Sequence, residues 1–543
     1  MPAHRPRPVW VATALATTVA AALLTGGSAS AVVGTPAPDG QYTFTARVQV
    51  GEGDSARACS GVLVAAQWVL TAAGCFADTP GAPVPAGKPA FKSTATLGAS
   101  AFEVTEITPR PDRDMVLAKL AQPTTGISPV KLAPAAPPQG AALSAAGFGR
   151  TKTEWVPGKL HTGAFDVVSV EATTMGLDAK ADSGATICKG DAGGPVLNAA
   201  GELVALSSRS WQAGCLGADP AETRTGAIAV RTDGLDEWIL QTRVLSHGWK
   251  TETVIQSGST LYQGIRLADG TWTGFADVQT KASDIGGIRT AAAAGISGDT
   301  HVLAIATDGS LQHTVRKADG TWTKFGNVGD VAGHLGSLTQ VAAVSIGNDL
   351  HVVAVANGKV FHTTRNALGQ WKQFGDVAGA AGPISVVTHA AAASVGGALQ
   401  VVTVSGGKAY HTLRNTAGQW SLWGNVAQAA GTTGPITGIA IAGIEGDAHV
   451  VVATDNGTRQ YHAIRKASAS WDRFGELTGY LGNTTAKSLS AAHVDGELQL
   501  AVVTADGKVV HTVRHADRTW TTTPVTLQGV TGTLGAVSVT GTL

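Results

Sequence analysis

The side chains best suited to covalent chemistry in this chain are four cysteines, all within its first 215 residues. They are Cys59, Cys75, Cys188 and Cys215. An even number of cysteines in an exported protein indicates two disulfide bonds. The second half of the chain contains no cysteine, so we expect packing alone to hold it together.

The first 31 residues indicate that the protein is exported. Arg5 and Arg7 precede an apolar run, Val9–Leu24, and Ala29-Ser30-Ala31 forms a small-x-small cleavage site. The alternative is a membrane anchor, but about 16 apolar residues are short for a span. We therefore expect residues 1–31 to be a cleaved signal peptide, and the protein to be secreted without a membrane span.

Short apolar runs separated by Gly, Pro and Asp turns fill residues 32–244, a pattern that favours an all-β sandwich or barrel. Five segments stand out: Val32-Val33-Gly34, Cys59-Ser-Gly-Val-Leu-Val with Trp68-Val-Leu-Thr-Ala-Ala-Gly-Cys75, Asp114-Met-Val-Leu-Ala-Lys-Leu120, Cys188-Lys-Gly-Asp-Ala-Gly-Gly-Pro195, and Ser210-Trp211 with Gly214-Cys215. In this order they resemble the mature N-terminus, the histidine region, the aspartate strand, the nucleophile loop and the pocket wall of trypsin-like serine proteases (peptidase S1). The resemblance implies two packed six-stranded β-barrels with the active site in the cleft between them.

Two positions depart from the family pattern at the groups that perform the chemistry. Gly74 stands where the family has histidine, and Ala192 stands where it has serine. A serine hydroxyl needs a hydrogen-bonded base to remove its proton, and the imidazole is that base. Only Asp114 of the triad remains. Its alternative role is structural, accepting hydrogen bonds from the backbone and from Ser210 in a buried cleft.

No other residue is expected to replace the missing groups. His161 and His247 are the other histidines of residues 32–252, and we place the first away from the cleft and the second in a linker. Ser183 and Ser210 are near the nucleophile loop in sequence but not on its turn. The resemblance implies that an oxyanion hole can survive, because it uses the backbone N–H groups of Gly190 and Ala192.

The resemblance also implies an altered specificity pocket formed by Thr186, Ser210, Trp211, Gln212 and Gly226. Thr186 stands where trypsin has an aspartate, Gln212 replaces a wall glycine, and Gly226 matches the other wall glycine. A side chain at Gln212 should narrow or fill the pocket, so substrate capture is expected to be impaired.

The structural features of the family are retained. The resemblance implies the disulfides Cys59–Cys75 and Cys188–Cys215, which close loops worth about 3 kcal/mol each. It also implies that Asp191 pairs with the N-terminal ammonium of Val32, which signal cleavage would expose. A buried carboxylate without that partner would be costly.

The second half, residues 253–543 after a linker at 245–252, repeats one motif six times. Each copy has an arginine followed six residues later by a tryptophan: Arg266 and Trp272, Arg316 and Trp322, Arg365 and Trp371, Arg414 and Trp420, Arg465 and Trp471, Arg514 and Trp520. A period of 49 to 51 residues with short strands predicts a six-bladed β-propeller. The first copy lacks its leading strand, and Gly535–Leu543 is expected to supply it.

These repeats are similar to tectonin-like and fucose-lectin-like propellers, which implies that their arginines and tryptophans bind glycans or cell-surface material. The alternative is that tryptophan packs between blades and arginine braces them. The formal net charge of zero and the lack of a basic run argue against nucleic acid as a partner. No cofactor or metal is expected.

Three functions follow from these patterns. The first is a secreted, catalytically inactive protease homologue that binds a protein partner in its cleft and carries a lectin-like propeller. The second is a serine endopeptidase that the propeller directs to its targets. The third is a structural or interaction protein without a sugar site.

Overall fold

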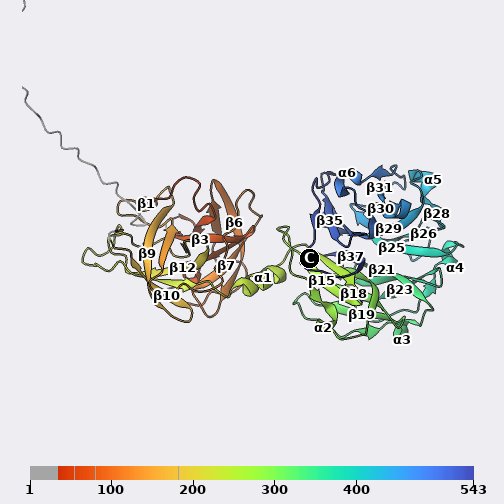
Figure 1. The fold of residues 1–543 in the computed structure, drawn as a ribbon, viewed down its shortest axis with the longest axis horizontal. Helices are drawn as coiled ribbons and strands as arrows, with labels where there is room; N and C mark the ends of the chain where they lie inside the picture. The colour runs from red at the N-terminus through yellow and green to blue at the C-terminus, as the bar shows by residue number, and fades with distance from the viewer. Residues whose placement is uncertain (1–34, 54–55, 80, 182) are drawn as a thin grey trace, which may run out of the picture. The chain divides into compact units, whose positions relative to one another are not determined.

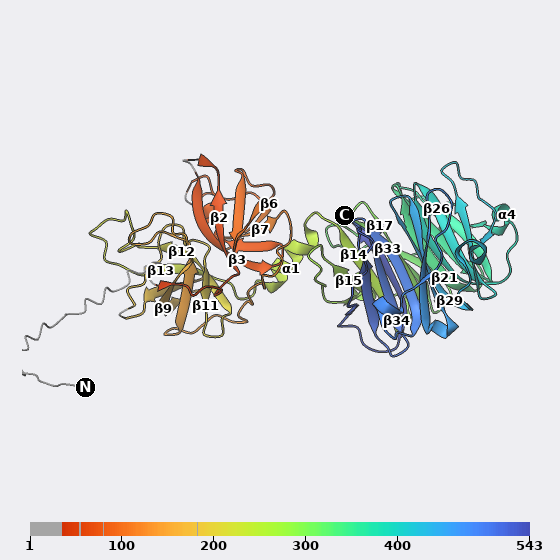
Figure 2. The same cartoon turned by 90° about the horizontal axis from the view of Figure 1, so that it is seen from above.

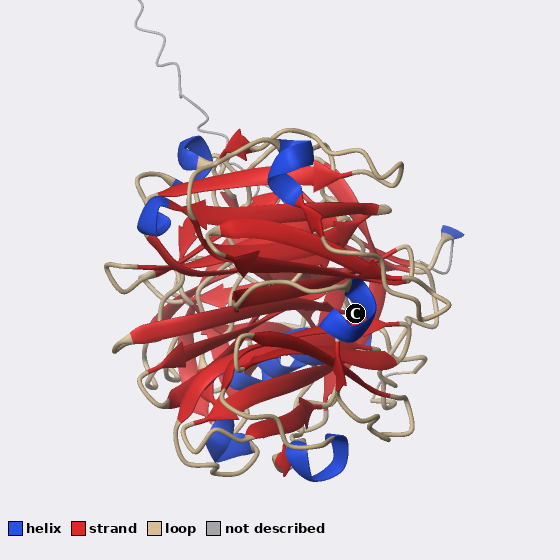
Figure 3. Ribbon diagram, turned by 90° about the vertical axis from the view of Figure 1, so that its right-hand side faces the viewer, coloured by secondary structure: helices blue, strands red, loops and turns tan. Residues whose placement is uncertain are grey.

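The structure is a computed structural model that describes residues 35–53, 56–79, 81–181 and 183–543. The predicted signal peptide and Val32 lie outside the described residues. Strands dominate the described chain, with a few short helices (Figure 3). The chain divides into two compact units between Leu235 and Asp236. This division places helix α1 (Asp236–Leu245) in the second unit, whereas the domain limits drawn from the sequence remain predictions.

The first barrel of unit 1 is closed by six antiparallel strands in the order β2-β3-β4-β7-β6-β5 (Figure 2). Its strands are β2 (Thr45–Val50), β3 (Arg57–Ala65), β4 (Trp68–Thr71), β5 (Ser93–Leu97), β6 (Ser100–Arg110) and β7 (Met115–Leu120). Alternate residues of β5 point inward, because strand side chains alternate between faces, and Ala95 and Leu97 are fully buried. They pack with Val48, Leu63 and Leu120 in one core.

The second barrel has six strands in a ring, with β1 (Thr35–Pro36) attached to β9. The strands are β8 (Ala142–Gly147), β9 (His161–Val170), β10 (Thr174–Ala179), β11 (Pro195–Leu197), β12 (Leu203–Ser210) and β13 (Ala227–Arg231). Pairing of β8 with β9 closes the ring around Phe165, Met175 and Leu177. The two six-stranded barrels predicted from the sequence are confirmed.

Unit 2 is a six-bladed propeller whose blades are four-stranded antiparallel sheets (Figure 1). The first blade combines β14 (Lys250–Ser257), β15 (Thr260–Arg266) and β16 (Ala276–Asp277) with β37 (Leu534–Thr542). The second to fourth blades are β17 (Ile288–Ile296), β18 (Asp299–Ala306), β19 (Leu311–Arg316), β20 (Gly326–Asn327); β21 (Leu338–Ile346), β22 (Asp349–Ala356), β23 (Lys359–Arg365), β24 (Gly375–Asp376); and β25 (Val387–Val395), β26 (Ala398–Ser405), β27 (Lys408–Arg414), β28 (Gly424–Asn425).

The fifth and sixth blades are β29 (Ile436–Ile444), β30 (Asp447–Thr454), β31 (Arg459–Arg465), β32 (Gly475–Glu476); and β33 (Ala486–Val494), β34 (Glu497–Thr504), β35 (Val509–Arg514), β36 (Val525–Thr526). One short helix follows the outermost strand of each of the first five blades: α2 (Val278–Lys281), α3 (Gly329–Ala332), α4 (Ala378–Ala381), α5 (Val426–Ala430) and α6 (Thr478–Leu481). These helices lie at the outer rim of the ring, and β21, β25, β29 and β37 lie near its centre (Figure 1).

The C-terminal strand closes the ring, as predicted. β37 pairs antiparallel with β14, from Lys250 opposite Thr542 to Ser257 opposite Leu534. Because the last strand of the chain completes the first blade, no blade is left with three strands and an unpaired inner edge.

Candidate functional site

The nucleophile turn of unit 1 is held in place by backbone geometry and one serine. Gly193 has φ 83°, and a Cβ there would lie 2.2 Å from the Ser60 carbonyl oxygen, so only glycine fits. The Ser60 hydroxyl donates to the Gly190 carbonyl at 2.9 Å, and the Ser60 N–H donates to the Ala192 carbonyl at 2.9 Å. Ala192 therefore sits on a turn that contacts of its backbone and of Gly190 hold in place, and its side chain packs against the core of the first barrel.

Asp114 faces Gly74, the position at which the family resemblance implies a histidine. The Gly74 N–H donates to Asp114 Oδ1 at 2.8 Å from the short 3-10 turn Ala73–Cys75. A Cβ built on Gly74 would meet only that oxygen, at 3.6 Å. The structure thus leaves open space for a side chain between residue 74 and the carboxylate.

The second hydrogen bond to Asp114 corrects the expectation for Ser210. The donor to Asp114 Oδ2 is the Ser208 hydroxyl, at 2.5 Å, whereas the Ser210 hydroxyl donates to the Ile187 carbonyl. The cause is a β-bulge in β12. Ser207 pairs with Ala229 and Arg209 with Ile228, which leaves Ser208 as the extra residue. Serines at both positions gave no sequence signal to choose between them.

The backbone groups expected to form the oxyanion hole are unused inside the fold. Neither the Gly190 N–H nor the Ala192 N–H donates to any residue that the structure describes. Their neighbours differ, since the Gly193 and Gly194 N–H groups donate to the Ser207 and Asp191 carbonyls. The oxyanion hole remains a prediction, and these two unused N–H donors are compatible with it.

A cavity of about 1560 Å³ extends over the cleft between the two barrels of unit 1. Gly74, Asp114, Ala192 and Ser208 line it, as do the expected pocket residues Ser210, Trp211 and Gln212. Gln212 has φ 64°, a conformation that glycine adopts at much lower cost.

The deeper pocket residues are not part of this cavity. Thr186 is buried with only 1% of its surface exposed, and it does not line the cavity. Gly226 is also absent from the lining, and a Cβ there would lie 3.2 Å from the Leu177 carbonyl oxygen and 3.5 Å from the Trp211 ring. The predicted pocket is therefore not one continuous open space.

The structure places neither remaining histidine of this region in the cleft. His161 begins β9, is buried opposite Gly147, and does not line the cavity; burial lowers its pKa. His247 lies in unit 2, between α1 and β14. Among the described residues that line the cleft there is no histidine at all.

Asp191 is completely buried beside the nucleophile turn. Its carboxylate accepts hydrogen bonds from the Gly149 N–H at 2.7 Å and the Cys188 N–H at 2.8 Å. Burial raises the pKa of Asp191 to about 7, against the lowering effect of those two donors. Gly147 and Gly149 have no room for a Cβ beside it. Because Val32 lies outside the described residues, its pairing with Asp191 remains a prediction.

The disulfide pairing implied by the family resemblance is confirmed. Cys59 is bonded to Cys75 and Cys188 to Cys215, across sequence separations of 16 and 27 residues. The first bond anchors the turn that contains Gly74, and the second begins at the nucleophile loop.

Comparison with known families agrees with this geometry. Residues 31–239 match the Trypsin family model. We refer to unit 1 as the trypsin-like domain. Two similar solved structures are neuropsin, a serine protease expressed in the limbic system of mouse brain (22% identity, TM-score 0.31), and one titled "Structure of GrC" (20%, TM-score 0.32). Each match covers 38% of this chain, and 98% and 97% of the respective solved chain. No curated protein matches the chain.

In the propeller, the repeated tryptophans lie between blades. Five of them meet, edge to face, a histidine of the preceding blade at ring-centroid distances of 5.2–5.8 Å: His313–Trp371, His362–Trp420, His411–Trp471, His462–Trp520 and His511–Trp272. Trp322 packs against an apolar cluster where the first copy has Gln263. These contacts are the ones expected if the tryptophans pack between blades. A ligand role for the tryptophans remains a prediction.

The histidines in these contacts are buried or half-buried, and most of them bond to a polar side chain. His301–His313, His351–His362 and His449–His462 are joined ring nitrogen to ring nitrogen at 3.0–3.1 Å, and His411 bonds to Gln400. Burial lowers the pKa of every member of this set, to about 3 for His411 and for His511. The rings are therefore neutral at physiological pH.

The repeated arginines have two kinds of environment. Arg316 is buried and forms an ion pair at 3.4 Å with Glu252 of the preceding blade. Arg365, Arg414 and Arg465 are half-buried beside their turns, yet they form no ion pair and donate no side-chain hydrogen bond to any described residue. A half-buried guanidinium without a partner is an available binding group.

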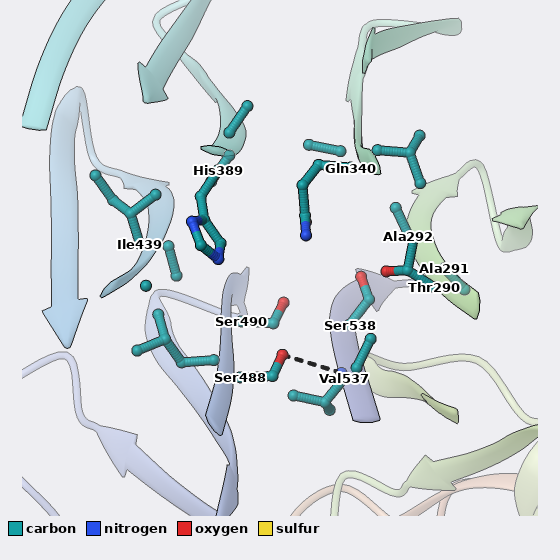
Figure 4. Close-up of a pocket in the computed structure, with 18 of the residues that line it drawn as sticks. Thr290, Ala291, Ala292, Gln340, His389, Ile439, Ser488, Ser490, Val537 and Ser538 are labelled. Carbon is teal, nitrogen blue, oxygen red and sulfur yellow. Dashed lines mark hydrogen bonds between the residues drawn. The ribbon is translucent and has the colours of Figure 1, made fainter. Parts of the chain in front are cut away.

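A second polar region lies at the propeller axis. Residues of the six inner strands line a cavity of about 450 Å³. Figure 4 shows His389 and Gln340 directed into it from one side, facing Ser488, Ser490 and Ser538. The Ser488 and Ser490 hydroxyls accept from the N–H groups of β37, so they also hold the last strand in place.

In the described residues, no cluster of three or more His, Cys, Asp or Glu side chains could hold a metal ion. No helix in that part of the chain is long and apolar enough to cross a membrane.

Proposed function

We propose that the trypsin-like domain is a non-catalytic protease homologue of a secreted protein, which binds in its cleft rather than cleaving. The observation that carries this proposal is the open space between Gly74 and Asp114, where a catalytic base would stand. Without a base or a nucleophile at Ala192, the oxyanion hole and binding leave a residual of about 10³–10⁴ over water, too slow for a useful protease.

The rest of the cleft supports binding. Its cavity of about 1560 Å³ is larger than a typical small-molecule site, and Trp155 and Trp211 are half-exposed at its wall. A protein partner suits these dimensions. Two disulfides and the lack of a membrane-crossing helix among the described residues are compatible with an extracellular protein, and the predicted signal peptide adds the secretion proposal.

A serine-directed fluorophosphonate probe tests the loss of the nucleophile. We expect no covalent labelling of the mature full-length protein under conditions that label trypsin fully. Labelling that survives mild denaturation and maps to any serine of the cleft, such as Ser208 or Ser210, would support the endopeptidase alternative instead.

We propose further that the propeller binds carbohydrate. The observation that favours this is the repeated, half-buried and unpaired guanidinium of Arg365, Arg414 and Arg465, each beside a turn that leads to a tryptophan. Arginine donates to hydroxyl groups, and several weak sites around one ring give avidity. The axial cavity, with His389 and Gln340, is a second place for a hydroxyl-rich ligand.

Two variants of the mature protein on a glycan array separate these places. A triple Arg365→Gln, Arg414→Gln, Arg465→Gln variant is expected to lose at least tenfold in apparent affinity, since avidity falls with the number of sites. Gln340→Ala is expected to change it by less than twofold. The reverse result would assign binding to the axial cavity. Failure of the unmodified protein to bind any glycan or cell-wall material would support the interaction protein without a sugar site.

A further inference from the structure

The cleft of the trypsin-like domain is strongly basic although the chain as a whole has 39 basic and 39 acidic residues. Seven of the described residues that line its cavity are Arg or Lys, and only Asp78 and Asp114 are acidic. Such an excess in a cavity with low-dielectric walls raises the local concentration of negatively charged ligands.

Most of this charge is not neutralised inside the fold. Arg110 and Arg113 pair with Asp112 at 2.7 and 3.3 Å, and Asp114 is already bonded to Gly74 and Ser208. The other five cations have no ion-pair partner among the residues that the structure describes: Arg47, Arg57, Arg150, Lys189 and Arg209. The described acidic residues of the cleft therefore do not neutralise its positive charge.

Three of these cations are held against aromatic rings. The guanidinium carbon of Arg150 lies 4.4 Å from the Trp155 ring centroid, and that of Arg47 lies 4.9 Å from the Phe148 centroid. Arg57 lies 6.0 Å from the Phe91 centroid. Two of these side chains already donate inside the fold, Arg47 to the Pro157 carbonyl at 2.7 Å and Arg57 to the Ala77 and Asp78 carbonyls. Stacking fixes the plane of the Arg150 guanidinium. Because Arg150 donates no side-chain hydrogen bond to a described residue, the donors at its edge keep the geometry that carboxylates match.

The remaining two cations flank the residues of the lost catalytic site. Lys189 precedes Gly190, Arg209 follows Ser208, and both are exposed. Both line the same cavity as Ala192. Thr186, where trypsin has an aspartate, adds no negative charge.

The edge of β12 favours a peptide over other anions. β11 pairs with β12 only as far as Leu206, and the Ser207 backbone bonds to the Gly193–Gly194 turn. Beyond that point, no described strand covers the cleft-side edge of Ser208–Ser210, while β13 covers the other edge. An extended peptide can add to such an edge through its backbone, whereas a polysaccharide cannot.

We propose that this cleft binds an extended peptide segment of a partner protein rich in aspartate and glutamate. Its backbone lies along Ser208–Ser210, and its apolar side chains contact Trp155 and Trp211. Its carboxylates meet Arg150, Lys189 and Arg209, which form no ion pair and no side-chain hydrogen bond with any described residue. The proposal rests on the proposed non-catalytic function, because a segment bound across Ala192 must remain uncleaved.

Fluorescence anisotropy with the mature full-length protein tests the proposal. The probe is a fluorescein-labelled ten-residue peptide of alternating glutamate and valine, compared with the same peptide carrying glutamine for glutamate. We expect saturable binding of the glutamate peptide, at least tenfold tighter than that of the glutamine peptide, and weakening as salt rises from 50 to 300 mM because the contacts are charge pairs.

The matched variants each remove two exposed positive charges. Lys189→Gln with Arg209→Gln should weaken binding at least tenfold. Lys131→Gln with Lys180→Gln, two exposed lysines of the same domain outside the cleft, should weaken it less than twofold. Equal loss in both variants, or equal binding of the glutamate and glutamine peptides, would overturn the proposal.

Two further readouts separate the alternatives. If a heparin oligosaccharide binds with the same sensitivity to the cleft variant while the peptide does not bind, the ligand is an anionic polysaccharide and the peptide proposal is wrong. Mass spectrometry of the peptide after incubation should show it intact. Cleavage would refute the non-catalytic function, while the acidic preference would still be decided by the anisotropy.

Discussion

The trypsin-like domain holds each functional group once, whereas the propeller holds its groups in six copies. In the first, the proposed loss of chemistry depends on two positions, Gly74 and Ala192, and the turns that hold them are fixed by backbone contacts. In the second, one copy can change, as Gln263 does in the first blade, while the other copies keep their histidine. Under the proposed function, a site present once can lose its chemistry while the fold around it is kept, whereas a site present in six copies loses its function only as several copies change.

The two regions also bury their polar groups differently. The trypsin-like domain encloses one carboxylate, Asp191, with two backbone donors and no cation among the described residues. The propeller encloses neutral imidazoles, mostly paired with one another across neighbouring strands, and a buried carboxylate, Glu252, that is paired with Arg316. The two units should therefore respond to pH in different ways, which provides a direct way to sharpen the comparison.

The largest effect is expected from removing β37. Deletion of residues 534–543 leaves β14 with an open edge and removes Val537 and Val539 from the core they share with Ile255. We expect the propeller to unfold and the trypsin-like domain to keep its own thermal transition, as read by calorimetry with limited proteolysis. Ser538→Ala, which keeps the strand, is the control, and a propeller that stays folded without β37 would show that ring closure is dispensable.

Acid should destabilise the propeller. Because burial lowers the histidine pKa values in the folded state, protonation favours the unfolded chain, and stability falls as pH drops from about 6.5 toward 4. At pH 4, protonation of His411 alone is expected to lower the free energy of unfolding by about 3 kcal/mol. Urea unfolding of the propeller at several pH values measures this. His411→Gln should flatten the pH dependence, and an unchanged slope would contradict the assigned burial.

A rise in pH from about 4 to about 7 should test the N-terminal pairing of the trypsin-like domain. With the pKa of Asp191 raised to about 7, its contribution is fully present below about pH 4 and is lost as pH rises toward 7, on the order of 4 kcal/mol. We expect this loss in a protein that keeps one extra residue before Val32, and not in one that begins at Val32. Asp191→Asn should remove the difference, and identical pH profiles of both forms would refute the Val32 pairing.

Sequence patterns predicted the fold where the information was local or repeated. The strand Gly535–Leu543 could be assigned because it copies the inner strand of the other repeats, and the disulfides followed from a family resemblance. Ser208 could not be chosen over Ser210, because the bulge that turns it toward Asp114 has no signature in a run of small polar residues. No sequence pattern predicted the basic cleft, because Arg47, Arg150 and Arg209 line one cavity only after both barrels have formed.

The propeller shows the same limit in another form. The spacing of Arg and Trp located the blades, but two interpretations of Trp471 remained, binding or packing. The choice depends on a neighbour in another repeat, His411, whose ring meets Trp471 at 5.8 Å. The sequence of a single repeat therefore cannot predict this contact.

The measurement that tests the central claim most directly is peptidase turnover by the mature protein beside a Gly74→His, Ala192→Ser double variant. The open space at Gly74 and the clamped turn at Ala192 lead us to expect no turnover from the unmodified protein and triad-dependent turnover from the variant, abolished by Asp114→Asn. Any turnover by the unmodified protein would contradict the account, and a Ser208→Ala, Ser210→Ala variant would then show whether a serine of this cleft supplies the nucleophile.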